Sequence, residues 1–237
     1  MRTPRPDRVP QALVEWPRAS RLLPARFQAV DCFERVLDPH EPGDGDILTH
    51  LSDLTAAAGV GDLSLMDPAQ VLFGTGAGWI NPSFTAPRAA RFSTSSRGAF
   101  YLAEDIETCV EEVRHHLAIA YQREGVKDVL EVDYRALVLH LRGNLHDIRT
   151  RPMTRAPWSA IYAPDSYAAS QAFAASLRSI GSNGIASASV RKPGGMCSAI
   201  FEPNILRSCR HDTWLAFRWD GAQVRRIVEK RIFAWGC

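Results

Sequence analysis

The stretch that decides the fold is Arg91 to Glu112, RFSTSSRGAFYLAEDIETCVEE. Within it, the apolar run from Ala99 to Ala103 is bounded by polar turns, a pattern that predicts a short buried strand. Asp105 follows, and a carboxylate at that position can accept hydrogen bonds from the free N–H groups of a first helical turn. The stretch therefore predicts a loop, a strand and a helix in succession.

The predicted helix continues well past Glu112. Apolar residues recur at helical spacing, so one face of the helix is expected to pack inward; these residues are Val110, Val113, Leu117 and Tyr121. Gly125 predicts the end of the helix, since glycine is favoured just after the last helical turn.

The N-terminal quarter of the chain gives weaker signals. Residues 1–26 are rich in Pro and Arg and predict an arm or irregular lead-in, and residues 27–36 fit either a strand or a short helix. Residues 46–58 predict a helix that ends at Gly59. We therefore assign residues 1–60 to an N-terminal arm and helical lead-in, and residues 61–237 to the main domain.

A glycine cluster, Gly74-Thr-Gly-Ala-Gly78, follows an apolar run. The sequence after it contains Pro82 and Pro87 where a phosphate-binding loop would lead into a helix, and it lacks Gly-Lys-Ser/Thr. Neither a dinucleotide fingerprint nor a P-loop is therefore predicted. A plain turn cluster is favoured over a mobile loop beside a ligand.

The C-terminal half alternates strand and helix signals. Strands are expected at 129–141, 185–190 and 197–201, with a turn at 142–144, a basic irregular segment at 145–158 and an Ala-rich helix at 164–180 that Gly181 closes. Asp220-Gly221 predicts the two-residue turn of a final hairpin. Strands outnumber helices, and they are joined both by hairpins and by helices. The sequence therefore predicts a single α+β domain with mixed and antiparallel sheets and flanking helices.

Composition excludes several classes of protein. The 237 residues are 46% hydrophobic and 23% charged, with a net charge of +2, which gives no sign of a nucleic-acid binder. Five cysteines without a C-x-x-C pair indicate reduced thiols rather than a disulfide framework or a zinc knuckle. There is no signal peptide and no apolar run long enough to span a membrane, so a cytoplasmic protein is expected.

The histidines do not predict a metal site. His115 and His116 are adjacent in a helix and point in different directions, and His140 and His146 have no carboxylate or cysteine at ligand spacing. Hydrolase motifs are also missing, since neither H-E-x-x-H nor G-x-S-x-G occurs.

Several residues, taken in order, match one known family. Arg91-Phe92 is followed by Tyr101 in the predicted strand and Glu112 in the predicted helix, and the downstream run G-I-A-S-A-S-V-R-K-P-G-G carries Ser189. This ordered set resembles the RES domain family, the toxin half of a class of bacterial toxin–antitoxin pairs. The resemblance covers about residues 73–201, and residues 61–237 would form the RES-like catalytic domain. Ser93 departs from the pattern, because many members carry Asn there.

The resemblance implies a fold like that of the diphtheria-toxin type of ADP-ribosyltransferases. It also implies an enzyme of a type II toxin–antitoxin system that acts on NAD as substrate, without a metal. Such enzymes cleave the nicotinamide–ribose bond and either transfer ADP-ribose to a protein target or degrade NAD by hydrolysis or phosphorolysis. The implied partner is an Xre-like antitoxin whose C-terminal part occludes the cleft, and neither membrane nor direct nucleic-acid binding is expected.

The resemblance gives each matched residue a role toward NAD. Glu112 would stabilise the positive charge that develops on the ribose, although the adjacent Glu111 is a rival that points about 100° away around the helix. Arg91 would pair with the pyrophosphate, and Tyr101 would stack on nicotinamide and offer its hydroxyl to a ribose oxygen. Ser189 would hydrogen-bond nicotinamide or ribose.

Two other functions are weighed against an NAD-consuming toxin. A nucleic-acid-cleaving toxin predicts a basic groove with aromatic residues and a His or Lys acid/base, and no such pattern is visible in the sequence. A non-catalytic binding module would leave the same residues with structural roles only. An assay that measures the consumption of NAD distinguishes the first function from the other two.

Overall fold

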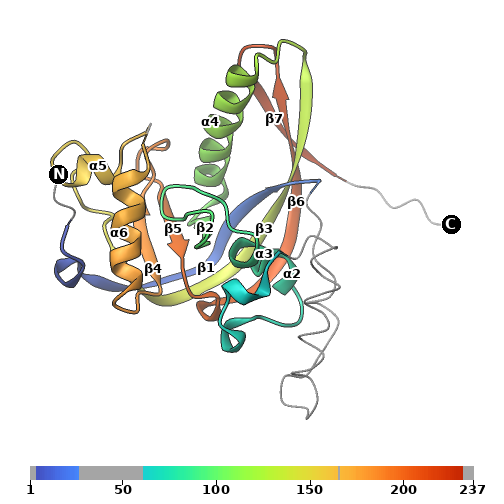
Figure 1. Cartoon of the computed structure of the whole chain (residues 1–237). Helices are drawn as coiled ribbons and strands as arrows, with labels where there is room; N and C mark the ends of the chain where they lie inside the picture. The colour runs from blue at the N-terminus through green and yellow to red at the C-terminus, as the bar shows by residue number, and fades with distance from the viewer. Residues whose placement is uncertain (1–3, 27–60, 165, 232–237) are drawn as a thin grey trace.

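A mixed sheet of seven strands organises the described residues of the computed structural model, which are 4–26, 61–164 and 166–231 (Figure 1). The strands are β1 (Gln11–Pro24), β2 (Phe100–Ala103), β3 (Leu130–Asp147), β4 (Gly184–Ala188), β5 (Met196–Ile200), β6 (Leu206–Trp219) and β7 (Val224–Lys230). The α-helices are α2 (Ala77–Ile80), α3 (Pro82–Thr85), α4 (Ile106–Glu124), α5 (Trp158–Ile161) and α6 (Ala168–Arg178). Short 3-10 turns are η1 (Pro6–Arg8), η3 (Leu63–Leu65), η4 (Pro68–Gln70) and η5 (Pro203–Ile205). The predicted α+β class is confirmed.

The sheet closes on itself over five of its strands. The order is β1-β2-β5-β4-β3-β6-β7, and β1 also pairs with β3, so β1, β2, β5, β4 and β3 form a ring of pairings. The pair β3–β4 is parallel, and the others are antiparallel. β6 and β7 continue outward from β3 as a wing (Figure 1).

The strand β1 corrects the prediction of an irregular arm, which is wrong for residues 11–24. β1 pairs with β3 along most of its length, and Val14 and Trp16 alternate toward the core. Pro17 hides this pattern in the sequence because proline cannot donate to a ladder. The register shifts between Trp16 and Ala19, so Pro17 lies in an irregularity where a missing N–H is tolerated. The segments predicted at 27–36 and 46–58 lie outside the described residues.

The central unit forms as the sequence predicts. β2 is followed by α4, and the Asp105 carboxylate accepts a hydrogen bond from the Thr108 N–H at 2.6 Å. Gly125 ends the helix in the left-handed backbone conformation, φ 68°. Glycine adopts this conformation without steric strain because it has no Cβ.

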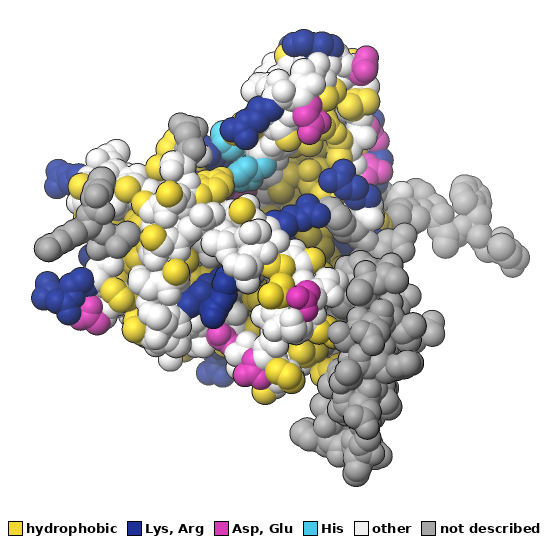
Figure 2. Space-filling model, viewed as in Figure 1, with side chains coloured by type: hydrophobic (Ala, Val, Ile, Leu, Met, Phe, Trp, Pro, Cys, Tyr) yellow, Lys and Arg dark blue, Asp and Glu magenta, His cyan; other side chains and the backbone are white. Residues whose placement is uncertain are grey.

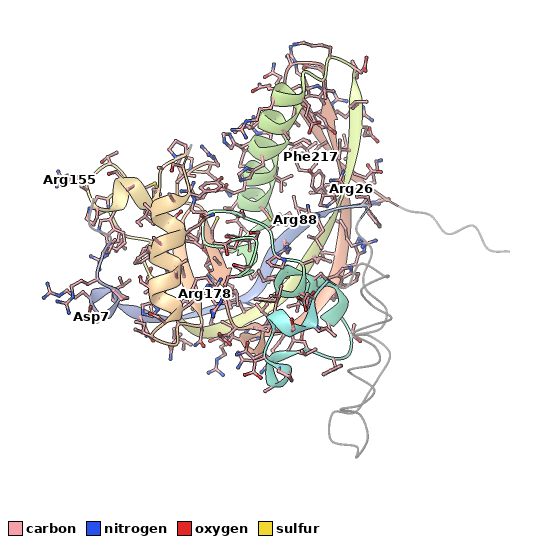
Figure 3. All side chains as sticks on the ribbon, in the orientation of Figure 1. Asp7, Arg26, Arg88, Arg155, Arg178 and Phe217 are labelled. Carbon is pink, nitrogen blue, oxygen red and sulfur yellow. The ribbon has the colours of Figure 1, made fainter. Side chains whose placement is uncertain are left out.

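One face of α4 packs against the wing. Leu117 is buried, and the other predicted face residues are partly buried around the core residues Phe217 and Trp219 of β6. The Tyr121 ring meets that of Trp219 edge-on with centroids 5.4 Å apart, and Phe217 packs from β6 in the same core cluster as the residues of α4 (Figure 3). The inward face predicted for this helix is therefore confirmed.

A second group of helices, α5 and α6, covers the other side of the ring. Phe173 and Leu177 of α6 are fully buried together with Ile185 of β4 and Ile161 of α5. The helix predicted at 164–180 is confirmed over 168–178, and Gly181 follows it with φ 74°. The two helical groups leave β2 between them (Figure 1).

The glycine cluster is a turn that leads into one-turn helices. α2 begins at Ala77 within the cluster and α3 begins at Pro82, so the prediction that no helix follows is wrong, although each helix spans only four residues. Gly76 has φ 88°, and a Cβ there would lie 2.2 Å from the Cys209 carbonyl oxygen of β6. The cluster therefore serves close backbone packing.

The turn predicted at 142–144 is wrong, because β3 continues through it to Asp147. The Ile205 side chain packs against the open face of Gly143, 3.0 Å from where a Cβ would be. Residues 145–147 are consequently strand rather than irregular.

The final hairpin is confirmed as β6 and β7, with Trp219 opposite Val224, but the two-residue turn predicted at Asp220-Gly221 is wrong, because four residues, 220–223, connect the strands. Gly221 supplies the positive φ of the turn, 93°. Asp220 instead accepts hydrogen bonds from the N–H groups of Ala222 and Gln223 at 2.9 and 2.8 Å. In the described part of the chain, no helix combines the length and apolar character needed to cross a membrane.

Candidate active site

A cavity of about 440 Å³ opens beside β2, between α4 and the loops that precede β2 and follow β4. Three of the four site residues predicted from the sequence line it, namely Arg91, Tyr101 and Glu112. They come from a loop, a strand and a helix, as the central unit requires. The cavity walls also include Arg21, Cys109, His116, Tyr167, Arg191 and Cys197.

Glu112 is held by the fourth predicted residue, Ser189. The Ser189 hydroxyl donates to Glu112 Oε1 at 2.6 Å. Ser189 itself is not among the residues that line the cavity, and it is buried. The structure therefore brings all four residues together, but Ser189 reaches the cavity through the carboxylate of Glu112.

Glu111 and Glu112 point to different places. Glu111 forms an ion pair with Arg114 at 2.6 Å and lines a separate open groove between α4 and the wing. Glu112 faces the cavity. Of the two adjacent carboxylates, only that of Glu112 can meet a ligand in this cavity.

The Tyr101 hydroxyl ties down the loop that carries Arg91. It accepts from the Phe92 N–H at 2.8 Å and donates to the Ser93 hydroxyl at 3.0 Å. Ser93 in turn donates to the Arg88 carbonyl at 2.7 Å, so Ser93 bridges the loop. Burial raises the pKa of Tyr101, which therefore stays a neutral phenol.

Arg91 is held by backbone carbonyls at the end of α5 and just after it. Its Nη1 donates to the carbonyls of Ile161 and Ala163 at 2.9 and 3.0 Å, and its guanidinium carbon lies 5.2 Å from the centre of the Tyr167 ring. Burial lowers the pKa of Arg91, but a guanidinium remains charged at neutral pH. These contacts fix a cation in the cavity wall.

Two interactions fasten the loop after β4 to α4, namely the Ser189–Glu112 hydrogen bond and the pairing of Lys192 with Asp105. Ser189 Oγ accepts from the N–H groups of Arg191 and Lys192, both at 3.0 Å. Lys192 Nζ also pairs with the Asp105 carboxylate at 2.9 Å, at the first turn of α4. The loop therefore holds Arg191 at the cavity that Glu112 lines.

Arg21 is a cavity residue that sequence reasoning missed. It projects from β1, donates from Nη1 to the Tyr101 carbonyl at 3.1 Å and lies 4.1 Å from the centre of the Phe100 ring. Its Nε is buried with no hydrogen-bond partner among the described residues, and burial lowers the pKa of Arg21 to about 10. A buried cation with an unused donor is suited to an anionic ligand.

Three further cavity residues were also missed: His116, Tyr167 and Arg191. A signal for His116 was present, because it lies one helical turn after Glu112 and shares its face. Arg191 stands two residues after Ser189 in the run that carries the family resemblance. Tyr167 gave no such signal, since it precedes α6 and reaches the cavity only through the tertiary fold.

The two thiols in the wall are not nucleophiles. Burial raises the pKa of Cys109 to about 12 and also raises that of Cys197. Both therefore stay protonated at neutral pH and contribute apolar wall. Within residues 4–26, 61–164 and 166–231, no three His, Cys, Asp or Glu side chains are grouped to hold a metal ion.

Comparison with known proteins identifies the family. No curated protein sequence matches the chain. Among solved structures, a chain of the crystal structure of the M. tuberculosis MbcT–MbcA toxin–antitoxin complex aligns with a TM-score of 0.48 and 14% identity, over 95% of this chain and 90% of that one. The family model of the RES domain matches residues 70–220, which is well over half of the chain. The protein therefore belongs to the RES domain family.

Proposed function

We propose that the protein is a toxin of a bacterial toxin–antitoxin system that cleaves the nicotinamide–ribose bond of NAD. The observation that carries the proposal is the convergence of Arg91, Tyr101 and Glu112 on one cavity. Family membership supports it, because the RES resemblance implies action on NAD.

The cavity suits a dinucleotide in size and charge. Its volume of about 440 Å³ lies in the usual range for small-molecule sites. The cations Arg21, Arg91 and Arg191 line it, and guanidinium groups pair well with pyrophosphate oxygens. Aromatic side chains at Tyr101 and Tyr167 offer ring faces to the nicotinamide or adenine.

Glu112 supplies the main catalytic effect in this proposal. Breaking the bond leaves the electron pair on nicotinamide, which departs as a neutral molecule, and positive charge develops on the ribose ring. A carboxylate fixed beside the ring stabilises that charge without reorganising. The hydrogen bond from Ser189 supports the proposal, since it holds Glu112 Oε1 in one place before the substrate arrives.

The hydrogen bonds in the site change the roles that the resemblance implies for Tyr101 and Ser189. Both hydroxyls already have protein partners, so a direct bond to NAD would require each to release one. We assign Tyr101 a stacking role through its ring and a positioning role through its hydroxyl. Ser189 is assigned the orientation of Glu112, and Arg91 keeps its proposed contact with pyrophosphate.

The proposal includes protein partners. The RES resemblance implies an Xre-like antitoxin whose C-terminal part occludes the cleft, and a target protein if ADP-ribose is transferred. A cytoplasmic site of action belongs to the same proposal, because NAD and such antitoxins are found there.

The test is nicotinamide release from NAD by the purified protein. Glu112→Gln should reduce release at least ~100-fold, because one charge that stabilises the transition state is lost. Glu111→Gln is the matched control: it removes a carboxylate from the adjacent position but leaves the cavity unchanged. Full activity in Glu112→Gln, or equal loss in both variants, would reject the assignment.

A second measurement separates the fates of ADP-ribose. With NAD labelled in its adenosine part, label on a protein band reports transfer. Label in free ADP-ribose or its phosphate reports degradation. Circular dichroism of each variant confirms that the fold is intact.

A further inference from the structure

We propose that His116 is the general base that removes the proton from a hydroxyl acceptor, water or a protein alcohol, as its oxygen attacks the ribose. This inference rests on the proposed cleavage of NAD and adds a second catalytic group to the same site. It follows from where His116 lies, which groups surround it and what Glu112 must do at the same time.

His116 is placed one turn beyond Glu112 on the same face of α4. Side chains four residues apart on a helix are neighbours, about 5–6 Å between Cβ atoms. His116 lines the cavity and is exposed, so it stands at the cavity mouth, where an acceptor enters. Figure 2 shows histidine and basic side chains gathered where α4 faces the lobe of α5 and α6.

The surroundings keep this imidazole neutral. Partial desolvation by the cavity wall, together with the charges of Arg191 and Arg91, lowers the pKa of His116. The other polar groups near it are Glu112 and His115 on its own helix, and the His115 ring meets it edge-on at 5.6 Å. No described residue forms a hydrogen bond with the His116 ring nitrogens, so a lone pair is available to accept a proton at neutral pH.

Glu112 cannot both stabilise the ribose cation and act as the base that takes the proton of the acceptor. It stabilises the ribose cation only while it carries its charge, and it would lose that charge if it took the acceptor's proton. In addition, its Oε1 already accepts from Ser189. A separate base next to Glu112 removes this conflict.

The proposed step breaks one covalent bond to C1′, forms another and moves one proton. The C1′–N bond of NAD breaks and its electron pair leaves with neutral nicotinamide. A bond forms between C1′ and the acceptor oxygen, and the O–H proton moves to the neutral ring nitrogen of His116. The imidazolium then releases that proton to solvent at the exposed mouth of the cavity.

The chemistry of the acceptor gives a sharp test. Water and alcohols must lose a proton as they attack, whereas a phosphate dianion already carries an ionised oxygen. His116 is therefore needed for hydrolysis or transfer to a hydroxyl, and it is not needed for attack by a phosphate dianion.

The experiment measures nicotinamide release by the full-length wild type, His116→Gln and His115→Gln. Hydrolysis is followed across pH in phosphate-free buffer, and phosphorolysis with inorganic phosphate at alkaline pH. His116→Gln should lose ~100-fold in hydrolysis and keep phosphorolysis within about twofold of the wild type. His115→Gln is the matched control, because His115 does not line the cavity, and it should keep both activities.

The pH profile adds an independent readout. A protonated imidazole cannot accept a proton, so wild-type hydrolysis should fall as the pH drops through the pKa of His116, below the ordinary value of about 6.5. The pH profile of His116→Gln should lack this fall in hydrolysis at low pH.

The failures can be told apart. Wild-type hydrolysis retained in His116→Gln, an unchanged fall in hydrolysis at low pH, or equal loss of hydrolysis and phosphorolysis would overturn the role of His116 alone. A wild type that uses phosphate but never water or a hydroxyl would do the same. A wild type that releases no nicotinamide under any condition would overturn the proposed function as well.

Discussion

At the scale of single residues, Tyr101 both lines the cavity and holds the adjacent loop in place through its hydroxyl. Its hydroxyl links the Phe92 N–H to the Ser93 side chain, so the loop carrying Arg91 is attached to the strand below it. A ligand that meets Arg91 therefore meets a side chain whose backbone has little freedom. The Tyr101 oxygen therefore contributes to the site by holding this loop, whether or not a substrate contacts that oxygen.

Replacing Tyr101 by Phe should destabilise the protein. The Phe92 N–H would lose its acceptor, and an unsatisfied polar group of this kind costs about 1–3 kcal/mol. Urea unfolding of Tyr101→Phe should show a lower midpoint than the wild type. Tyr121→Phe is the control, because the Tyr121 ring packs on Trp219 and its hydroxyl bonds to no described residue; equal midpoints in Tyr101→Phe and wild type would refute this role of the Tyr101 hydroxyl.

Sequence reasoning reached Glu112, Arg91 and Tyr101 because the family pattern runs through one short stretch of chain. It missed Arg21 because the strand that carries it contains Pro17 and Pro24 and looked irregular. It gave Ser189 a direct contact with substrate because a sequence shows that a hydroxyl is present but not what it bonds to. In the fold, that hydroxyl donates a hydrogen bond to Glu112.

At the scale of elements, the first turn of α4 joins the helix to the loop that carries Arg191. The Asp105 carboxylate accepts from the Thr108 N–H and hydroxyl at 2.6 and 3.0 Å, and it pairs with Lys192. One side chain thus caps the helix and holds the loop. Although burial acts to raise it, hydrogen bonds from Lys192 and Thr108 lower the pKa of Asp105 overall.

Asp105→Ala should lower the free energy of unfolding by ~1 kcal/mol at neutral pH, the usual effect of losing an N-cap. Because the folded-state pKa is lowered, this stability is present above the unfolded-state value of about 3.9 and is lost as the pH falls through the folded-state pKa. Denaturant titrations at several pH values should show the gap between wild type and variant shrinking in acid. The exposed Glu124, at the other end of α4, provides the control variant Glu124→Gln. If the difference in unfolding free energy between the wild type and Asp105→Ala stays constant in acid, the role of Asp105 is contradicted.

Elements with complete local signals were predicted well, and the others were not. The helix at 106–124 has a cap, an apolar face and a terminal glycine, and the last hairpin has a glycine turn, so both are confirmed. The strand β3 passes through Arg142-Gly143-Asn144, a turn signal that is overridden because Ile205 packs on Gly143. That contact is made at long range, and no local pattern contains it.

At the scale of the whole molecule, β1 completes the ring of strands and contributes Arg21 to the cavity. The family match begins only at residue 70 and does not include this strand. The part of the chain that identifies the family is therefore smaller than the part that builds the site.

A fragment that starts at residue 61 should fail to fold cooperatively. Without β1, the long edge of β3 loses its partner and buried residues such as Val14, Trp16 and Leu22 leave the core. Thermal unfolding followed by circular dichroism should show a cooperative transition for the full chain and none for the fragment. Adding a synthetic peptide of residues 11–24 is a control for specific pairing. A fragment that melts like the full chain would show that the ring is dispensable.

The ring also determines how much of the polypeptide must be synthesised before the cavity exists. The cavity draws its walls from residues as early as Arg21 and as late as Ala199. A ribosome must therefore release most of the polypeptide before the cavity can form. Nascent and prematurely terminated chains therefore lack a complete cavity.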